Sequence, residues 1–165
     1  MPKLFLPYQA ERRWLNYMVG APSVTGLKAA IESGYIRVGL FKSDVVPALD
    51  DEISDYLTIE ATYSGYAREQ IEVFAAASTN GSGQTIAVCP AVTFIHSGGG
   101  VSNSIYGYFL VDTQDTGAGG ETDDGTLMGV HRFPDANRPK TMSISSHFIT
   151  ITPRIQLRTI TPTDP

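Results

Sequence analysis

Cysteine is nearly absent from the chain, since Cys89 is the only one in 165 residues. A single cysteine cannot form an intrachain disulfide, which excludes the small secreted modules that disulfides hold together. Cys89 lies in the apolar stretch "TIAVCPAV", where no neighbour supplies the base or positive charge that a reactive thiolate needs. We therefore expect Cys89 to be a small buried side chain and not a catalytic thiol.

Long apolar runs and an excess of positive charge are also missing. No apolar segment approaches the roughly 20 residues that cross a bilayer as a helix, so we expect no membrane association. The stretch "MPKLFLPYQAERRW" at the N-terminus is interrupted by Pro7 and three charges and has no signal-peptide core. We therefore expect synthesis in a cytoplasm. The net charge of -5 opposes nucleic-acid binding, because such a surface should be basic.

The charges that are present are unevenly distributed. No Asp, Glu, Lys or Arg occurs from Val73 to Leu110, whereas residues 111–125 carry five acids and no base. A sheet with one face in water normally shows some charge on that face. Two explanations are open: the uncharged window lies in a protein–protein interface, where charge is depleted, or its outer face is polar through Ser, Thr, Asn and Ala. We favour the interface.

Helical periodicity is confined to the N-terminal part of the chain. Ala10, Trp14 and Met18 recur at a spacing of four, which predicts a helix over residues 9–20. Ser or Thr at the start and Gly at the end favour a second short helix within residues 22–34.

From Gly34 onwards the apolar period becomes two. About eight strands follow, separated by short turns and without helices between them. This pattern predicts a mainly all-β protein, an antiparallel sandwich or barrel. We assign three regions: a helical N-terminal extension (1–34), a β-sandwich domain (35–160) and a frayed C-terminus (161–165).

No motif of enzyme chemistry stands out. The Gly-x-Ser-x-Gly turn of many serine hydrolases is missing. His96, His131 and His147 lie on separate predicted strands or at their ends, and we favour ordinary strand histidines over a metal site, because no His-x-His pair or carboxylate cluster accompanies them. The acidic stretch 112–125 lacks the order of an EF-hand, and we favour a solvated loop over a calcium site. We predict no catalytic residue, cofactor or metal; a β-sandwich hydrolase or cupin-like metalloenzyme is the alternative.

Two stretches of the sequence carry a recognisable pattern: "EATYSGYAREQIEVF" (60–74) and "AVTFIHSGGGVSNSIYGYFLVD" (91–112). Together with "GLF" in the first predicted strand, they resemble a group of small virion proteins of tailed bacteriophages. The resemblance covers roughly residues 35–112. The matching residues are Gly39 to Phe41, Glu60, Gly65 to Arg68, Val92 to Phe94, Gly98, Gly99, Tyr106 to Phe109 and Asp112.

This resemblance implies a jelly-roll-like β-sandwich that binds assembled capsid shells as a decoration, or cement, protein. Such proteins often form trimers, so we expect a homotrimer that binds the major capsid protein on the virion surface, after synthesis in the host cytoplasm. The resemblance implies no catalytic residue. The alternative within the same setting is a tail, fibre or head-knob component that recognises a host surface or a glycan.

Six residues are candidates for the expected interface. In "SNSIYGYFLVD" (102–112) every position in the middle is apolar, and we expect one face to lie in the protein's own core while a partner covers the other. Arg68 either pairs with a carboxylate across the interface or forms an ion pair within its own chain, with Glu60 or Glu72. We favour the ion pair within the chain. Aromatic residues are enriched in interfaces as well as in cores. The candidates are Tyr106, Tyr108, Leu110, Tyr66, Arg68 and Trp14.

Overall fold

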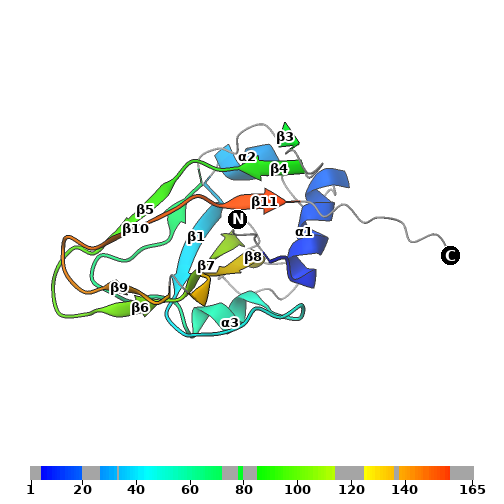
Figure 1. The fold of residues 1–165 in the computed structure, drawn as a ribbon. Helices are drawn as coiled ribbons and strands as arrows, with labels where there is room; N and C mark the ends of the chain where they lie inside the picture. The colour runs from blue at the N-terminus through cyan, green and yellow to red at the C-terminus, as the bar shows by residue number, and fades with distance from the viewer. Residues whose placement is uncertain are drawn as a thin grey trace.

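The protein is mainly β, with antiparallel sheets and a few short helices (Figure 1). The computed structural model describes residues 5–19, 27–32, 34–71, 78–79, 85–113, 125–135 and 138–156. The helices in this part of the chain are α1 (Tyr8–Val19), α2 (Leu27–Glu32) and α3 (Ile53–Leu57). The strands are β1 (Ile36–Phe41), β2 (Glu69–Gln70), β3 (Ser78–Thr79), β4 (Thr85–Val88), β5 (Val92–Ile95), β6 (Asn103–Ile105), β7 (Gly107–Asp112), β8 (Thr126–Arg132), β9 (Lys140–Met142), β10 (Phe148–Ile151) and β11 (Arg154–Gln156).

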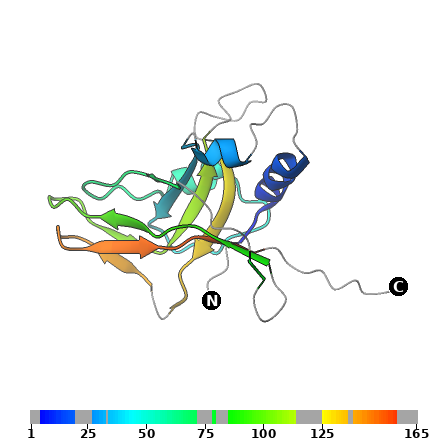
Figure 2. The ribbon, with the colours of Figure 1, turned by 90° about the horizontal axis from the view of Figure 1, so that it is seen from above.

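Most of the strands belong to one long hairpin that is folded back on itself. Going outward from the closed end of the hairpin, β7 pairs with β8, β6 with β9, β5 with β10 and β4 with β11, all antiparallel. Two neighbouring loops, residues 96–102 and 143–147, carry the hairpin over from the β6–β9 part to the β5–β10 part. Figure 2 shows the outcome as two layers, with the β4–β5 and β10–β11 stretch lying against the central sheet.

The central sheet has the strand order β2-β1-β7-β8. It forms because β1 pairs with β7 along its whole length, from Ile36 opposite Asp112 to Phe41 opposite Gly107. The main apolar core lies between this sheet and the second layer. It contains Leu40, Tyr108, Leu110 and Met128 from the sheet with Phe94, Ile149 and Ile151 from β5 and β10.

A second apolar cluster covers the opposite face of the central sheet. The short helix α3 lays Ile53 and Tyr56 against Phe109 and Val111 of β7. The sequence did not predict this helix. Because α3 covers one face of β7 and the folded hairpin covers the other, every residue of β7 is buried within the chain itself.

The two Gly-x-Phe motifs of the sequence face each other across β1 and β7. Gly39 lies opposite Phe109, and Phe41 lies opposite Gly107. Each phenylalanine ring crosses the glycine of the other strand: a Cβ added to Gly39 or to Gly107 would lie 2.3 Å from the facing ring. Glycine at these two positions therefore makes room for two aromatic rings, and Tyr56 packs on both rings.

Helix α1 packs on its own sheet, next to β8. The Trp14 indole donates a hydrogen bond to the Met128 carbonyl at 3.1 Å. The Arg13 side chain forms an ion pair with Asp112 at the end of β7, with Nε 2.6 Å from the carboxylate, and both side chains are buried. Among the described residues, no helix is long and apolar enough to span a membrane.

The observed elements refine the expected ones. The helix expected over 9–20 is α1, and the second lies at 27–32. The expectation of a mainly β, antiparallel fold is confirmed. Two apolar stretches of the sequence are each divided into two strands: Tyr106 separates β6 from β7, and Thr152 and Pro153 separate β10 from β11. Residues 114–124 of the acidic loop and the C-terminal residues 161–165 lie outside the described residues.

Candidate interaction surface

The folded end of the hairpin gathers three segments that are distant in sequence. Loop 96–102 runs beside loop 143–147, where the His96 amide donates to the His147 carbonyl at 3.0 Å. The turn at Ser64 and Gly65 joins them, because Ser64 accepts from the Ser97 amide and donates to the Val101 carbonyl. We call residues 64–65, 95–102 and 143–148 the uncharged tip. It forms the far left end of the molecule in Figure 1, opposite α1.

Two histidines fix the shape of the uncharged tip. His96 is fully buried and stacks on Tyr63, with ring centroids 5.5 Å apart. Its Nδ1 accepts from the Gly98 amide at 2.9 Å, which leaves Nε2 to donate to the Val101 carbonyl, also at 2.9 Å. His147 Nδ1 accepts from the Ser143 amide at 3.2 Å. Both imidazoles thus satisfy backbone groups where the chain turns over.

The three histidines do not converge on one site. His131 lies on β8, where its ring packs beside Tyr108. Within the described ranges, no group of three or more His, Cys, Asp or Glu side chains is placed to hold a metal ion.

Large apolar side chains are exposed at the uncharged tip. Ile95 and Phe148 face each other across β5 and β10 and are 59% and 66% exposed. Val101 and Ile144, in the two adjoining loops, are about half exposed. An exposed apolar patch rimmed by polar residues is typical of a protein–protein contact surface.

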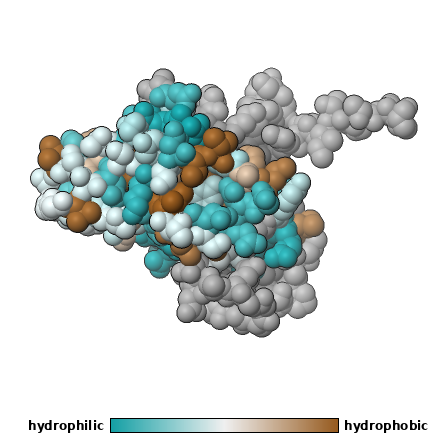
Figure 3. Space-filling model, turned by 90° about the horizontal axis from the view of Figure 1, so that it is seen from below, coloured by the Kyte–Doolittle hydropathy of each residue, from teal (hydrophilic) through white to brown (hydrophobic). Residues whose placement is uncertain are grey.

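The uncharged tip and most of the strand residues that carry it lack ionised side chains. Residues 61–67, 91–111 and 141–153 contain no Asp, Glu, Lys or Arg in 41 positions, where the chain's own share of 18% would give about seven. In Figure 3 this end is mostly white with brown patches, whereas teal covers much of the rest of the drawn surface. The sequence contains a second long uncharged run at 141–153, besides the run 73–110. This second run is the signal that sequence reasoning missed.

The expectation for the "IYGYFLVD" strand needs a correction. Tyr108 is 4% exposed and Leu110 is fully buried, and both pack in the main core with Phe94 and Ile149. The second face of this strand is therefore covered by the chain's own hairpin and not by a partner. An apolar run shows that both faces are buried, but it does not show which molecule covers them.

Tyr66 and Arg68 belong to a local network around Glu60. Arg68 binds the Glu60 carboxylate with two hydrogen bonds, of 2.8 and 2.7 Å. The Tyr66 hydroxyl donates to the same carboxylate at 2.6 Å and accepts from the Leu40 amide. Burial, with the Glu60 charge in addition, raises the pKa of Tyr66 above its usual range. We favoured an ion pair of Arg68 with a carboxylate of its own chain, and the pair with Glu60 is confirmed.

Two other candidates are partly buried in the folded chain. Trp14 packs against the main core, and Tyr106 packs against the cluster under α3. Their roles in an interface, like those of Tyr66 and Arg68, stay predictions.

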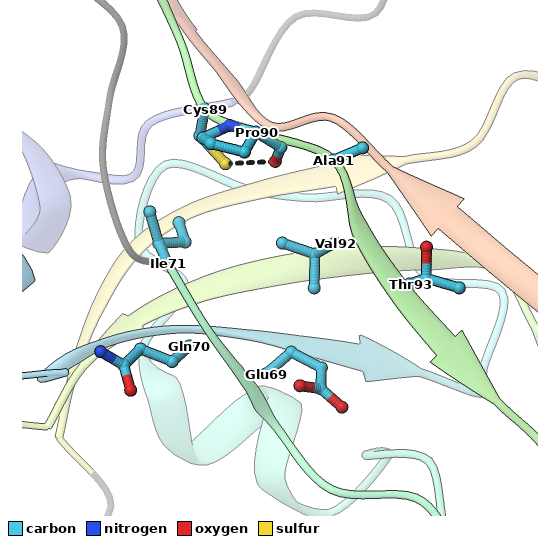
Figure 4. A pocket seen from close by; sticks show the side chains of 8 residues that line it. All are labelled: Glu69, Gln70, Ile71, Cys89, Pro90, Ala91, Val92 and Thr93. Atoms are coloured by element: carbon cyan, nitrogen blue, oxygen red, sulfur yellow. Dashed lines mark hydrogen bonds between the residues drawn. The ribbon is translucent and has the colours of Figure 1, made fainter.

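A cleft of about 250 Å³ separates β2 from the bend between β4 and β5 (Figure 4). Ile71 and Val92 line its two sides, and Glu69 and Cys89 contribute the ionisable groups. Cys89 is 2% exposed, as expected, and burial raises the pKa of its thiol to about 12. A protonated thiol and one carboxylate make no nucleophile–base pair, so this cleft is a weaker candidate site than the uncharged tip.

Comparisons with models of protein families, with curated proteins and with solved structures found no match to this chain.

Proposed function

We propose that this chain is a non-enzymatic structural protein of a bacteriophage virion that decorates the capsid by binding the major capsid protein. In this proposal it has a jelly-roll-like sandwich and acts as a homo-oligomer, a trimer. The observation that carries the proposal is the uncharged tip. It presents exposed apolar side chains on a two-stranded arm, and its charge depletion is typical of the core of a protein interface, which supports the oligomer that would bind the shell.

The residues of the sequence resemblance support the same proposal. "GLF" and "YGYF" supply the two Gly-x-Phe pairs between β1 and β7, and "GYAR" supplies the network around Glu60. These motifs therefore build the fold, which is what a shared architecture requires. A long hairpin folded into two layers is also the general plan of a jelly roll.

A small contact surface on each copy is sufficient for binding to a capsid shell. Each contact by itself is weak when it buries little area, but an oligomer that engages several capsid subunits gains from their proximity. A decoration protein can therefore stabilise a shell without a large interface on any one copy.

The test is a count of copies in purified particles of the phage that encodes this chain, by quantitative mass spectrometry. We expect on the order of hundreds of copies, because a symmetric shell repeats its binding site. A handful of copies would instead place the chain in the tail, a fibre or a vertex. Absence from the particles would contradict the proposal.

A second test is the return of purified chain to particles that lack it. We expect co-sedimentation with the shells and saturation at a fixed ratio to the major capsid protein. Empty tail structures from the same preparation serve as the control, and binding to tails but not to shells would favour the tail or fibre alternative.

A further inference from the structure

We propose that the outer face of the β5–β10 ribbon at the uncharged tip binds the same face of a second copy of this chain. The biological setting of this contact rests on the proposed function, but the physical argument does not. The contact would join two copies through identical surfaces related by a twofold axis, so on a shell it would link neighbouring trimers and would differ from the contacts within a trimer.

The outer face is formed by alternate residues of two paired strands. Phe94 and Ile149 point into the core, so their neighbours in sequence point outward. Ile95 faces Phe148 on this side, and the hydroxyls of Thr93 and Thr150 lie 3.1 Å apart beside them. The face therefore carries two large apolar and two small polar side chains, with its backbone fixed by strand pairing.

The amount of apolar surface fits a weak contact between two copies. Ile95, Phe148, Val101 and Ile144 are each between 49% and 66% exposed, and together they present on the order of 400 Å². Two copies that meet over the whole uncharged tip, with its loops included, would bury about twice this apolar area. With the surrounding Ser, Thr and Gly, the total approaches the lower limit of about 1,200 Å² for specific interfaces. We expect a dissociation constant in the micromolar range.

The absence of charge favours a second copy over a foreign protein. In a contact across a twofold axis, each residue near the axis meets its own copy, so any charge there meets a charge of the same sign. An uncharged face avoids this repulsion. A foreign partner has no such restriction and commonly uses complementary charges for steering and specificity. The chain carries 17 acidic and 12 basic residues, and it places none of them in the three segments that form this end.

The first experiment measures association of the full chain by sedimentation velocity up to about 100 µM. We expect concentration-dependent association of the wild type, and at least a tenfold weaker association of the double variant Ile95→Thr/Phe148→Thr. Both residues are exposed and threonine suits a strand, so the fold should be retained, which a thermal melt checks. The matched control is Val46→Thr/Leu49→Thr, which removes two exposed apolar side chains elsewhere and should associate like the wild type.

The second experiment separates contact between identical faces from any other contact. Thr150→Lys and Thr150→Glu each place one charge on the outer face, so each variant alone should stay monomeric through like-charge repulsion. An equimolar mixture should associate again, because opposite charges then meet across the axis. A wild type that stays monomeric throughout, or a Lys variant that associates as the wild type does, overturns the proposal.

The two proposals fail separately in these experiments. A chain that does not associate through this face but still saturates capsid shells retains the decoration role and removes the self-contact. A chain that associates through this face but is absent from virions retains the self-contact and removes the decoration role.

Discussion

Two tyrosines in the same turn have opposite surroundings for their hydroxyl groups. Tyr63 and Tyr66 pack edge to face, with ring centroids 5.3 Å apart. The Tyr66 hydroxyl donates to Glu60 and accepts from the Leu40 amide. The Tyr63 hydroxyl is buried and, among the described residues, has no hydrogen-bond partner. Burial and the Glu69 charge raise the pKa of Tyr63 to about 12.

This difference predicts opposite effects for the same substitution. Tyr66→Phe should lower the free energy of unfolding by about 1–3 kcal/mol, because it leaves the Leu40 amide without a partner and removes a bond to a carboxylate. Tyr63→Phe should leave stability unchanged or raise it by up to about 1 kcal/mol, since it removes an unpaired polar atom from the interior. Urea unfolding of the two variants measures both values, and each is the control for the other. A Tyr63→Phe variant that loses as much as Tyr66→Phe would show that the Tyr63 hydroxyl has a partner.

At the scale of elements, the pairing of β1 with β7 depends on two glycines with different neighbours. A Cβ at Gly107 would lie 2.2 Å from the His131 carbonyl oxygen, a backbone atom, in addition to the Phe41 ring. A Cβ at Gly39 would meet only the Phe109 ring among its nearest atoms, at 2.3 to 2.8 Å. A ring can rotate or shift more easily than a paired strand can.

Alanine substitution should therefore rank the two sites. Gly107→Ala should cost more than about 3 kcal/mol of unfolding free energy and Gly39→Ala about 1–3 kcal/mol. Gly100→Ala is the control, because nothing lies within 4 Å of its added Cβ, and it should be close to neutral. Equal losses at Gly39 and Gly107 in thermal melts would contradict the ranking.

Helix α1 is held to the sheet by a buried ion pair as well as by packing. Asp112 is fully buried and Arg13 is 5% exposed. Such a pair compensates its own desolvation only while both charges are present. Trp14, the only tryptophan of the chain, lies next to this pair in sequence and reports the position of the helix.

Removal of one partner should therefore loosen α1. Arg13→Met leaves the Asp112 carboxylate buried without its guanidinium and should cost about 3–5 kcal/mol. The double variant Arg13→Met/Asp112→Leu should recover part of that loss, because no uncompensated charge then stays buried. Trp14 fluorescence follows the helix and circular dichroism follows the sheet during urea unfolding. A single variant with wild-type stability by both probes would show that the pair contributes nothing to docking.

The sequence could predict those elements whose apolar residues recur at a regular spacing. Helical spacing around Trp14 predicted α1 to within one residue, and the period of two after Gly34 predicted a strand at the position of β1. The apolar strand at Tyr108 and Leu110 was expected to meet a partner, because no local pattern indicated that the folded hairpin covers these two residues. The long connection after β1, with one proline and several acids, did not indicate the helix α3 that covers Phe109 on the other face. The packing of one layer of the fold against another leaves no local pattern in the sequence. Two long uncharged runs contribute to the uncharged tip. The run 73–110 was recognised in the sequence, and the run 141–153 was not.

At the scale of the whole molecule, charge and apolar exposure are separated. A network of ion pairs joins Asp44 to Arg132 and Arg138, with Asp135 as a further partner, and it ties the connection after β1 to the turn after β8. Such exposed pairs contribute little to stability, but they hold these loops in place, and none of them lies in the uncharged tip. The uncharged tip is left as the surface where two negatively charged molecules can approach closely.

This separation predicts how self-association responds to salt. A contact without charges has no ion pairs for salt to screen, whereas the net charge of -5 on each copy repels the other copy at longer range. Raising sodium chloride from about 50 to about 500 mM shortens the Debye length from roughly 14 Å to roughly 4 Å, which weakens that repulsion. The dissociation constant measured by sedimentation should therefore stay constant or fall a few-fold, and the Thr150→Lys and Thr150→Glu mixture, whose contact includes an added charge pair, should respond in the opposite direction. A wild type whose association weakens tenfold with salt would show that the two copies meet through charged surfaces and not through the uncharged tip.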